Sequence, residues 1–201
     1  MTRFLISAGA TREPIDAVRF VGNRSSGKLG VALADAVREA GHEATLVMAA
    51  CEVPVPSGAE RVETTQQLLE ALMAEWPTHD VLIMAAAVAD FRPVKTTTGK
   101  LKRGDQLTIE LEPTVDVLAT LCEMKRPDQA VVGFKLEDDI TRAREKFEQL
   151  DLDLLVFNPL DTMGAPGIDA TLIDREGETG LGAMEKGTFA RVLVRRACSL
   201  K

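Results

Sequence analysis

Short apolar runs alternate with longer amphipathic stretches along most of the chain. The apolar runs end at polar or turn-forming positions, which predicts short strands that are buried in a sheet at residues 4–6, 45–49, 81–88, 130–134 and 154–157. The amphipathic stretches carry apolar residues at helical spacing, which predicts helices at residues 26–40, 65–76, 138–150 and 185–200.

This alternation predicts an α/β fold, a three-layer sandwich around a Rossmann-like, largely parallel sheet. Residues 107–111 and 170–173 alternate between apolar and polar side chains, so we expect them to form an antiparallel extension at the sheet edge. Residues 96–105 are polar and rich in lysine, which predicts an exposed, mobile loop. The length suits one core, so residues 1–201 are expected to form a single domain.

Composition narrows the class of protein. The net charge of −7 argues against general binding of nucleic acid or of a membrane surface, although a local basic pocket is compatible with it. Cys51, Cys122 and Cys198 form no CxxC pair, and His42 and His79 are isolated, so no metal site or disulfide is expected. The first apolar run is too short for a signal peptide or membrane span, which predicts a cytoplasmic protein.

A glycine- and serine-rich segment, residues 22–30, precedes the first predicted helix. Its spacing imitates a Walker A loop, but Leu29 stands where that loop needs a metal-binding Ser or Thr, and no strand is predicted to lead into it. Two interpretations remain. The segment binds an anion with its hydroxyls and helix-start amides, or Ser25 or Ser26 simply caps the helix.

Later segments carry further candidate groups. Residues 84–90 end a predicted buried strand with small alanines and Asp90, which suits either a ligand site at the strand end or a tightly packed strand that turns at Asp90. The cations at residues 100–103 either close over a polyphosphate or form a solvated charge run. Phe134 and Asn158, at two other strand ends, either bind a base or complete the core and a turn.

In this order the segments resemble the phosphopantothenoylcysteine synthetase family. The matching pieces are GATREPID (9–16), VRF (18–20), NRSSGKLG (23–30), AAAVAD (85–90), KLKR (100–103), GF (133–134) and Asn158. Many bacterial members are fused to a flavin-dependent decarboxylase, for which this chain has no room. We therefore expect the synthetase alone, with a separate decarboxylase as a possible partner.

The resemblance implies a ligase of coenzyme A biosynthesis, which joins 4′-phosphopantothenate and L-cysteine through an acyl-cytidylate or acyl-adenylate intermediate and releases pyrophosphate. It also implies a homodimer and magnesium. The implied catalytic residues are Asn23, Lys100 and Arg19, of which Arg19 reaches the neighbouring subunit's site. The implied nucleotide-binding residues are Gly9, Ser25, Gly27, Gly30, Phe134, Lys146 and Asn158. The implied phosphopantothenate-binding residues are Asn23, Ala86, Ala87, Asp90 and Arg19.

Some positions depart from the family pattern. Residues 9–11 read Gly-Ala-Thr instead of Gly-Gly-Thr or Gly-Pro-Thr, Leu150 replaces a second lysine, and residues 134–137 are similar to eukaryotic and stand-alone members. Fusion-type bacterial members use CTP and eukaryotic members accept ATP. The bacterial character of the front half favours CTP, with ATP as the alternative. No carboxylate cluster that could serve as metal ligands is evident in the sequence.

Two other functions fit the strand–helix rhythm. A short-chain oxidoreductase using NAD(P) is opposed by the lack of G-x-G-x-x-G after the first strand and by the complete absence of tyrosine. A non-catalytic nucleotide-binding regulator would keep the sites at Gly27 and Phe134 but would not need Lys100 or Asn23.

Overall fold

The computed structural model describes residues 1–104, 106–162, 165 and 167–201. Its centre is an eight-stranded sheet in the order β12-β11-β10-β9-β6-β1-β4-β5. The strands are β1 (Arg3–Ala8), β4 (Glu43–Met48), β5 (Glu60–Arg61), β6 (Val81–Met84), β9 (Ala130–Leu136), β10 (Leu154–Asn158), β11 (Gly167–Asp174) and β12 (Gly177–Glu185). Neighbouring strands are parallel from β10 through β9, β6, β1 and β4 to β5. At the other edge, β10 pairs with β11 and β11 pairs with β12 in antiparallel fashion.

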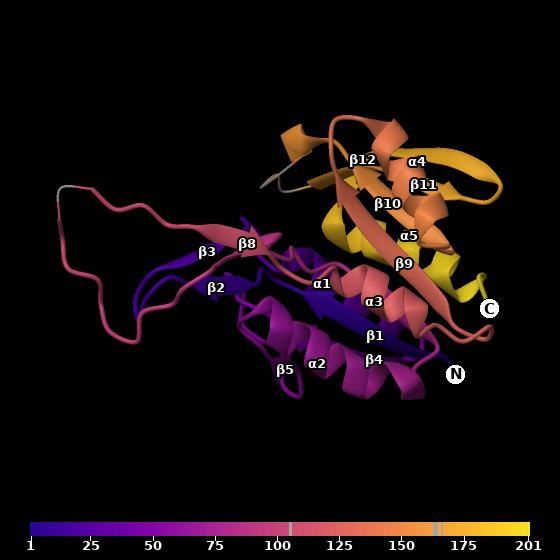
Figure 1. Cartoon of the computed structure of the whole chain (residues 1–201). Coiled ribbons are helices and arrows are strands. Elements are labelled where there is room, and N and C mark those ends of the chain that lie inside the picture. Colours follow the sequence, from indigo (N-terminus) through magenta and orange to yellow (C-terminus); the bar gives the residue numbers. More distant parts are fainter. Residues whose placement is uncertain (105, 163–164, 166) are drawn as a thin grey trace.

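Helices cover both faces of this sheet, as Figure 1 shows. Alternate residues of β1 point to opposite faces, so Phe4 and Ile6 pack with α1 (Lys28–Glu39) and α5 (Lys186–Cys198), while Leu5 faces the other layer. That layer contains α2 (Thr65–Glu75), α3 (Val117–Glu123) and α4 (Ile140–Gln149). The predicted three-layer α/β sandwich with an antiparallel edge is therefore confirmed.

Two short ribbons project from the body as an arm, here defined as residues 12–22, 91–104 and 106–113 (Figure 1). One ribbon pairs β2 (Arg12–Pro14) with β3 (Phe20–Gly22), and the other pairs β7 (Phe91–Pro93) with β8 (Leu111–Pro113). Backbone bonds join their loops: the amide of Thr97 donates to the carbonyl of Ile15 at 3.1 Å. The arm therefore brings residues near 16 and near 100 together.

Several predicted boundaries are wrong in instructive ways. The apolar run at 81–88 leaves the sheet after Met84, because its last residues bond to the loop that follows β1. Of the predicted strand at 107–111, only Leu111 lies in a strand, whereas 170–173 lies within β11. A short strand, β3, does lead into the glycine- and serine-rich segment, but it belongs to the arm. The end of the predicted loop, Asp105, lies outside the described residues.

Buried polar groups outside the cleft are satisfied within the fold. His79 is buried, and its ring bonds to Thr45 Oγ1 at 2.8 Å and to the carbonyl oxygen of Glu75 at 2.7 Å, which gives it a structural role. The single tryptophan, Trp76, is also buried and donates its indole N–H to the carbonyl of Leu121. None of the helices in the described part combines the length and the apolar character needed to cross a membrane.

Candidate functional site

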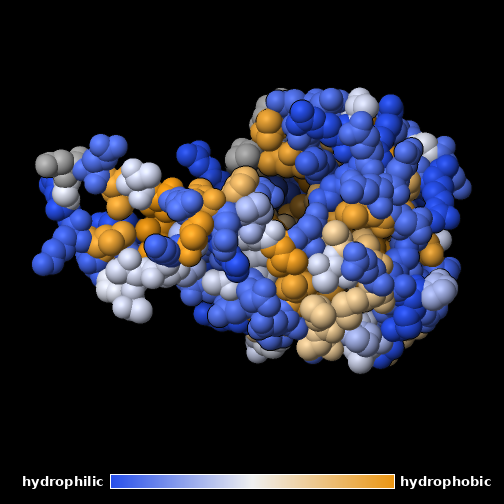
Figure 2. Space-filling model, viewed as in Figure 1, coloured by the Kyte–Doolittle hydropathy of each residue, from blue (hydrophilic) through white to orange (hydrophobic). Residues whose placement is uncertain are grey.

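A cleft of about 1400 Å³ opens at the carboxyl ends of the parallel strands. Its walls come from the loop after β1, the start of α1, residues 84–90, and the ends of β9 and β10. Figure 2 shows the surface hollowed between the base of the arm and the part of the body that carries β9 to β12. Ligands in open α/β sheets bind at this edge, so the cleft is the candidate active site.

The start of α1 has backbone amides that are poorly satisfied. Gly27 is the N-cap, lies in the left-handed region with φ of 74°, and makes no side-chain capping bond. Ser25 Oγ accepts from the amide of Gly27, and Ser26 Oγ from that of Lys28, both at the long distance of 3.4 Å. The simple helix-cap interpretation is therefore wrong, and weakly engaged amides and hydroxyls face the cleft, as an anion site requires.

Three glycines let backbone segments approach closely beneath this loop. A Cβ on Gly27 would lie 2.8 Å from Cys51 Cβ, and one on Gly9 would lie 2.6 Å from the carbonyl oxygen of Ala50. A Cβ on Gly30 would lie 2.2 Å from the Ala8 methyl, where α1 crosses β1. Gly27 and Gly30 line the cleft, whereas Gly9 supports it from behind and is not among its lining residues.

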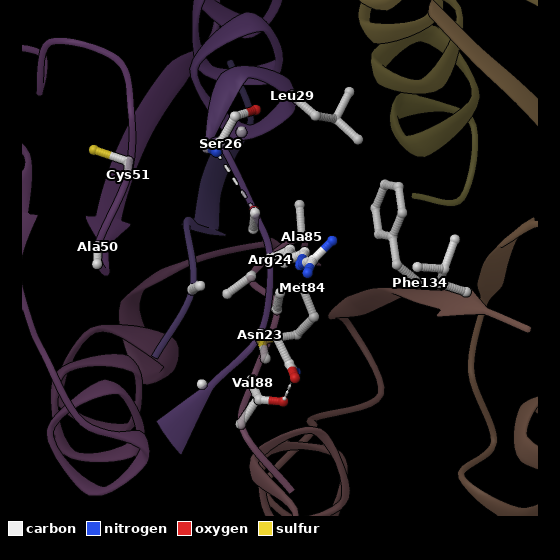
Figure 3. A pocket seen from close by; sticks show the side chains of 18 of the residues that line it. Asn23, Arg24, Ser26, Leu29, Ala50, Cys51, Met84, Ala85, Val88 and Phe134 are labelled. Atoms are coloured by element: carbon white, nitrogen blue, oxygen red, sulfur yellow. Dashed lines mark hydrogen bonds between the residues drawn. The ribbon is translucent and has the colours of Figure 1, made fainter. Parts of the chain in front are cut away.

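The segment after β6 forms the cleft floor. The amide of Ala87 donates to the carbonyl of Gly9 at 2.8 Å, and the amide of Ala86 donates to Ser7 Oγ at 3.2 Å, so the backbone is fixed while the methyl groups leave space. Asn23 Nδ2 donates to the carbonyl of Val88 at 2.7 Å, which holds the amide above this floor (Figure 3). The structure thus brings Asn23, Ala86 and Ala87 together, and Asp90 lines the same cleft.

The opposite wall combines an aromatic ring with polar groups. Phe134 is half-buried and meets Phe189 edge-on at 6.5 Å between ring centroids, so one part of its ring faces the cleft (Figure 3). Asn158 is buried and donates to the carbonyl of Asp169 at 3.1 Å. Lys146 Nζ lies 3.7 Å from an Asp116 carboxylate oxygen. All of these except Phe189 and Asp169 line the cleft.

The cleft is electropositive although the chain is acidic. Among the described lining residues six are basic, Arg12, Arg24, Lys28, Lys135, Lys146 and Lys186, and three are acidic, Glu52, Asp90 and Asp116. The whole chain carries a net charge of −7. The local excess of positive charge favours binding of an anionic ligand in the cleft.

Arg19 and Lys100 do not line the cleft. Both are exposed and lie on the arm. Arg19 Nη1 donates to Asp16 Oδ2 at 3.1 Å, and the amide of Leu101 donates to the same oxygen at 3.1 Å. Asp16 is buried and therefore ties the Arg19 turn to the Lys100 loop.

The Asp16 carboxylate is held in its charged form. Desolvation by burial acts to raise the pKa of Asp16. Hydrogen bonds from the backbone amides of Val18, Arg19 and Leu101, together with the charge of Arg19, outweigh this effect and lower the pKa below its ordinary value. Sequence reasoning included Asp16 in the family motif without giving it a role. The available signal was an acidic residue three positions before Arg19.

Other lining residues were also missed. The Arg12 guanidinium stacks 4.4 Å from the centre of the Phe20 ring at the base of the arm. Arg24 and Lys186 line the cleft as well. Arg12 stands inside a quoted motif, but no pattern in the sequence shows that Lys186 returns to the site from the last helix.

Comparisons with known proteins agree with this geometry. Residues 1–200 match the family described as the DNA/pantothenate metabolism flavoprotein C-terminal domain. A protein named cysteine/cysteine sulfinic acid decarboxylase, from an unknown prokaryotic organism, is 40% identical over 210 residues, with 98% of this chain and 58% of that protein covered. The coenzyme A biosynthesis bifunctional protein CoaBC of Thermococcus kodakarensis is 38% identical over 201 residues, with 95% of this chain and 49% of that protein covered.

A solved structure extends the agreement to three dimensions. The crystal structure of the C-terminal domain of a coenzyme A biosynthesis bifunctional protein CoaBC matches with a TM-score of 0.82 and 36% identity, covering 97% of this chain and 93% of that one. The chain spans about half the length of the two relatives named above. Sequence and fold agree over nearly the whole chain, which therefore belongs to the DNA/pantothenate metabolism flavoprotein C-terminal domain family.

Proposed function

We propose that this chain is a phosphopantothenate–cysteine ligase of coenzyme A biosynthesis. The carrying observation is the cleft itself, in which Asn23 stands above the Ala86–Ala87 floor beside the electropositive start of α1. The name of the Thermococcus kodakarensis relative, a coenzyme A biosynthesis bifunctional protein, supports the same pathway. Neither relative named above is called a nicotinamide oxidoreductase or a regulator, so those alternatives gain no support.

The reaction needs two displacements, because a carboxylate has no good leaving group. First, the phosphopantothenate carboxylate attacks the α-phosphorus of a nucleoside triphosphate, and the bond to the β-phosphate breaks to release pyrophosphate. Next, the cysteine amine attacks the acyl carbon of the mixed anhydride. The bond from that carbon to the phosphate oxygen breaks, the nucleoside monophosphate leaves, and the amine loses a proton as the amide forms.

The cleft residues suit these steps. The amide of Gly27 and the hydroxyl of Ser25, which line the cleft, would bind phosphate oxygens on which negative charge develops in the first step. The bond from Asn23 to Val88 uses one Nδ2 hydrogen, which leaves the other hydrogen and Oδ1 for the acyl phosphate. Phe134 and Asn158 would bind the base and ribose, and Lys146 would bind the nucleotide from the same wall.

We propose CTP as the nucleotide, with ATP as the alternative, because the front half of the sequence has bacterial character and the match to the Thermococcus kodakarensis CoaBC covers 95% of this chain. Magnesium would arrive with the triphosphate as part of the substrate. In the described ranges no three His, Cys, Asp or Glu side chains gather as metal ligands, and oxygen atoms of the phosphates are ligands that magnesium prefers. Turnover assays with CTP and ATP in parallel, each with and without magnesium, test both points.

We further propose that two copies associate through their arms, and that Arg19 and Lys100 act at the partner's cleft or close over it. The arm exposes several apolar side chains, among them Val18 at 61%, Phe20 at 47% and Leu107 at 57%. Sedimentation of the purified chain measures its oligomeric state. Mixing Arg19→Ala with Asn23→Asp should restore about a quarter of the activity if Arg19 acts on the partner, since one site of each mixed dimer is intact. No recovery would place Arg19 in its own subunit's site.

The sharpest test of the proposed function is Asn23→Asp. The added charge repels the acyl phosphate and one donor is lost, so the variant should form the acyl-nucleotide but convert it slowly to the amide. Mass spectrometry of a quenched reaction measures the accumulated intermediate. Lys95→Ala, an exposed arm change outside the proposed site, serves as the control. Normal amide formation by Asn23→Asp would refute the role of Asn23, and absence of any pyrophosphate release by the wild type would refute the function.

A further inference from the structure

Two lysines line one end of the cleft from neighbouring helices. Lys28 is the first residue of α1 and Lys186 is the first residue of α5. The two helices pack side by side on one face of the sheet (Figure 1), although their sequences are far apart. A site assembled from residues 28 and 186 is therefore a product of the fold.

Neither lysine forms an ion pair with a carboxylate of the described residues. In contrast, two other lysines of the cleft are paired: Lys135 lies 3.7 Å from Glu137, and Lys146 lies 3.7 Å from Asp116. Lys186 Nζ donates to the carbonyl oxygen of Ala165 at 2.8 Å, which is a neutral acceptor and leaves its charge uncompensated. Both lysines therefore present unneutralised charge to the cleft.

This arrangement is electrostatically unfavourable without a ligand. Lys186 is half-buried, and desolvation by burial lowers its pKa, which the charge of Lys28 lowers further. A cation at the first position of a helix also opposes the positive end of the helix dipole. No acidic residue stands at the N-cap or in the first turn of α1, and α5 has only its N-cap Glu185. An anion with more than one charge between the lysines would relieve both unfavourable interactions.

The position of Lys186 connects it to the proposed nucleotide wall. Phe189 lies three residues after Lys186, on the same side of α5, and its ring contacts the ring of Phe134. Lys28 directly follows Gly27, whose amide faces the proposed phosphate site. The two lysines thus adjoin the two walls that a nucleotide would have to span.

We propose that Lys186 and Lys28 together bind the phosphate chain of the nucleotide. This inference rests on the proposed function and adds to it a binding residue from the last helix. The pair holds the charged chain both before and during the reaction, so it contributes to nucleotide affinity more than to turnover. We expect the pair to favour the triphosphate over the monophosphate, because the triphosphate carries more negative charge.

The test compares Lys186→Met and Lys28→Met with the wild type in calorimetric titrations with CTP, CMP and inorganic tripolyphosphate. Each variant should weaken binding of CTP and of tripolyphosphate by about 10- to 100-fold, the usual loss for one charge-assisted hydrogen bond, and weaken CMP much less. In turnover assays the KM for CTP should rise by a similar factor with kcat little changed. Lys186→Arg, which keeps the charge, should recover most of the affinity.

Arg191→Met is the matched control, because it removes one positive charge from the same helix at an exposed position outside the cleft. It should leave CTP affinity unchanged. Lys28 is exposed, so Lys28→Met should fold normally and provides a second test if Lys186→Met does not fold. Urea unfolding of Lys186→Met should show undiminished stability, because a repelled and partly buried cation is removed.

The outcomes separate this inference from the proposed function. If the wild type binds CTP and forms product while the lysine variants bind CTP as tightly as Arg191→Met does, the lysine pair is refuted and the ligase proposal stands. If the wild type binds tripolyphosphate through the lysines but forms no amide, the ligase proposal fails and the anion site stands. If the wild type binds neither these three ligands nor ATP, both proposals are refuted.

Discussion

Replacement of Gly30 by alanine tests whether the contact of α1 with β1 sets the geometry of the cleft. A Cβ at this position would lie 2.2 Å from the Ala8 methyl and 3.1 Å from the Ala8 Cα. Non-bonded carbon atoms are at their best separation at about 3.5–4.0 Å. The helix start must therefore move away from the sheet by about 1.5 Å, and Gly27 and Ser25 move with it.

The magnitude follows from two opposed effects. Overpacking a close contact costs about 1–3 kcal/mol, while replacing glycine with alanine in a helix returns up to about 1 kcal/mol. We expect a net loss of about 1–2 kcal/mol in the free energy of unfolding, or a fall in Tm of about 2–8 °C for a chain of this size. Urea unfolding followed by Trp76 fluorescence measures it, because that buried indole is the single tryptophan.

Gly187→Ala is the matched control. Gly187 also lies in the first turn of a helix, but a Cβ there meets nothing within 4 Å. This variant should be as stable as the wild type or more stable by up to about 1 kcal/mol. If Gly30→Ala unfolds at the same urea concentration as Gly187→Ala, the close contact between α1 and β1 does not constrain the helix start, and the reasoning fails.

Two further predictions concern titrating groups. Asp16→Asn should loosen the arm and lower the unfolding free energy. Because the folded pKa of Asp16 is depressed, the difference from wild type should be present above the ordinary value of 3.8 and be lost as pH falls through the lowered folded value. The exposed Asp35→Asn serves as the control variant. Desolvation by burial raises the pKa of Cys122 to about 11, so iodoacetamide at pH 8 should alkylate it about 100-fold more slowly than a free cysteine. Mass spectrometry measures the rate of alkylation. Alkylation of the folded protein at the rate of a free cysteine would contradict this prediction.

The body of the fold was predictable because its strands and helices carry strong local patterns. The runs at 4–6, 130–134 and 154–157 lie within β1, β9 and β10. The arm was not predictable, because strands of three residues, such as β7, are too short to show an alternation of apolar and polar positions. The arm is also stabilised by contacts between residues near 16 and near 100, which no local pattern reveals. The strand β12 was missed for a similar reason, since its glycines and exposed polar residues give no apolar alternation.

The candidate site was predictable where a motif carries its own geometry. Gly27 and Asn23 stand in one continuous segment, and the structure places both at the cleft. Lys186 was missed, because it lies near Lys28 only after β11 and β12 bring the chain back to the face of the sheet on which α1 packs. Arg19 was assigned from resemblance alone, whereas Lys100 also stands in the run of cations at residues 100–103 that the sequence singled out. The approach of both residues to a cleft remains a proposal that depends on the arm.

Because α5 packs against α1, one half of the core stays open until the last helix is in place. The side chains of Phe189, Leu193 and Val194 complete a cluster that begins with Phe4 and Ile6. Contacts between residues so distant in sequence slow folding, since the chain must close a long loop before they form. A nascent chain that still lacks this helix therefore exposes the apolar faces of α1 and β1, and we expect it to be prone to aggregation at that stage.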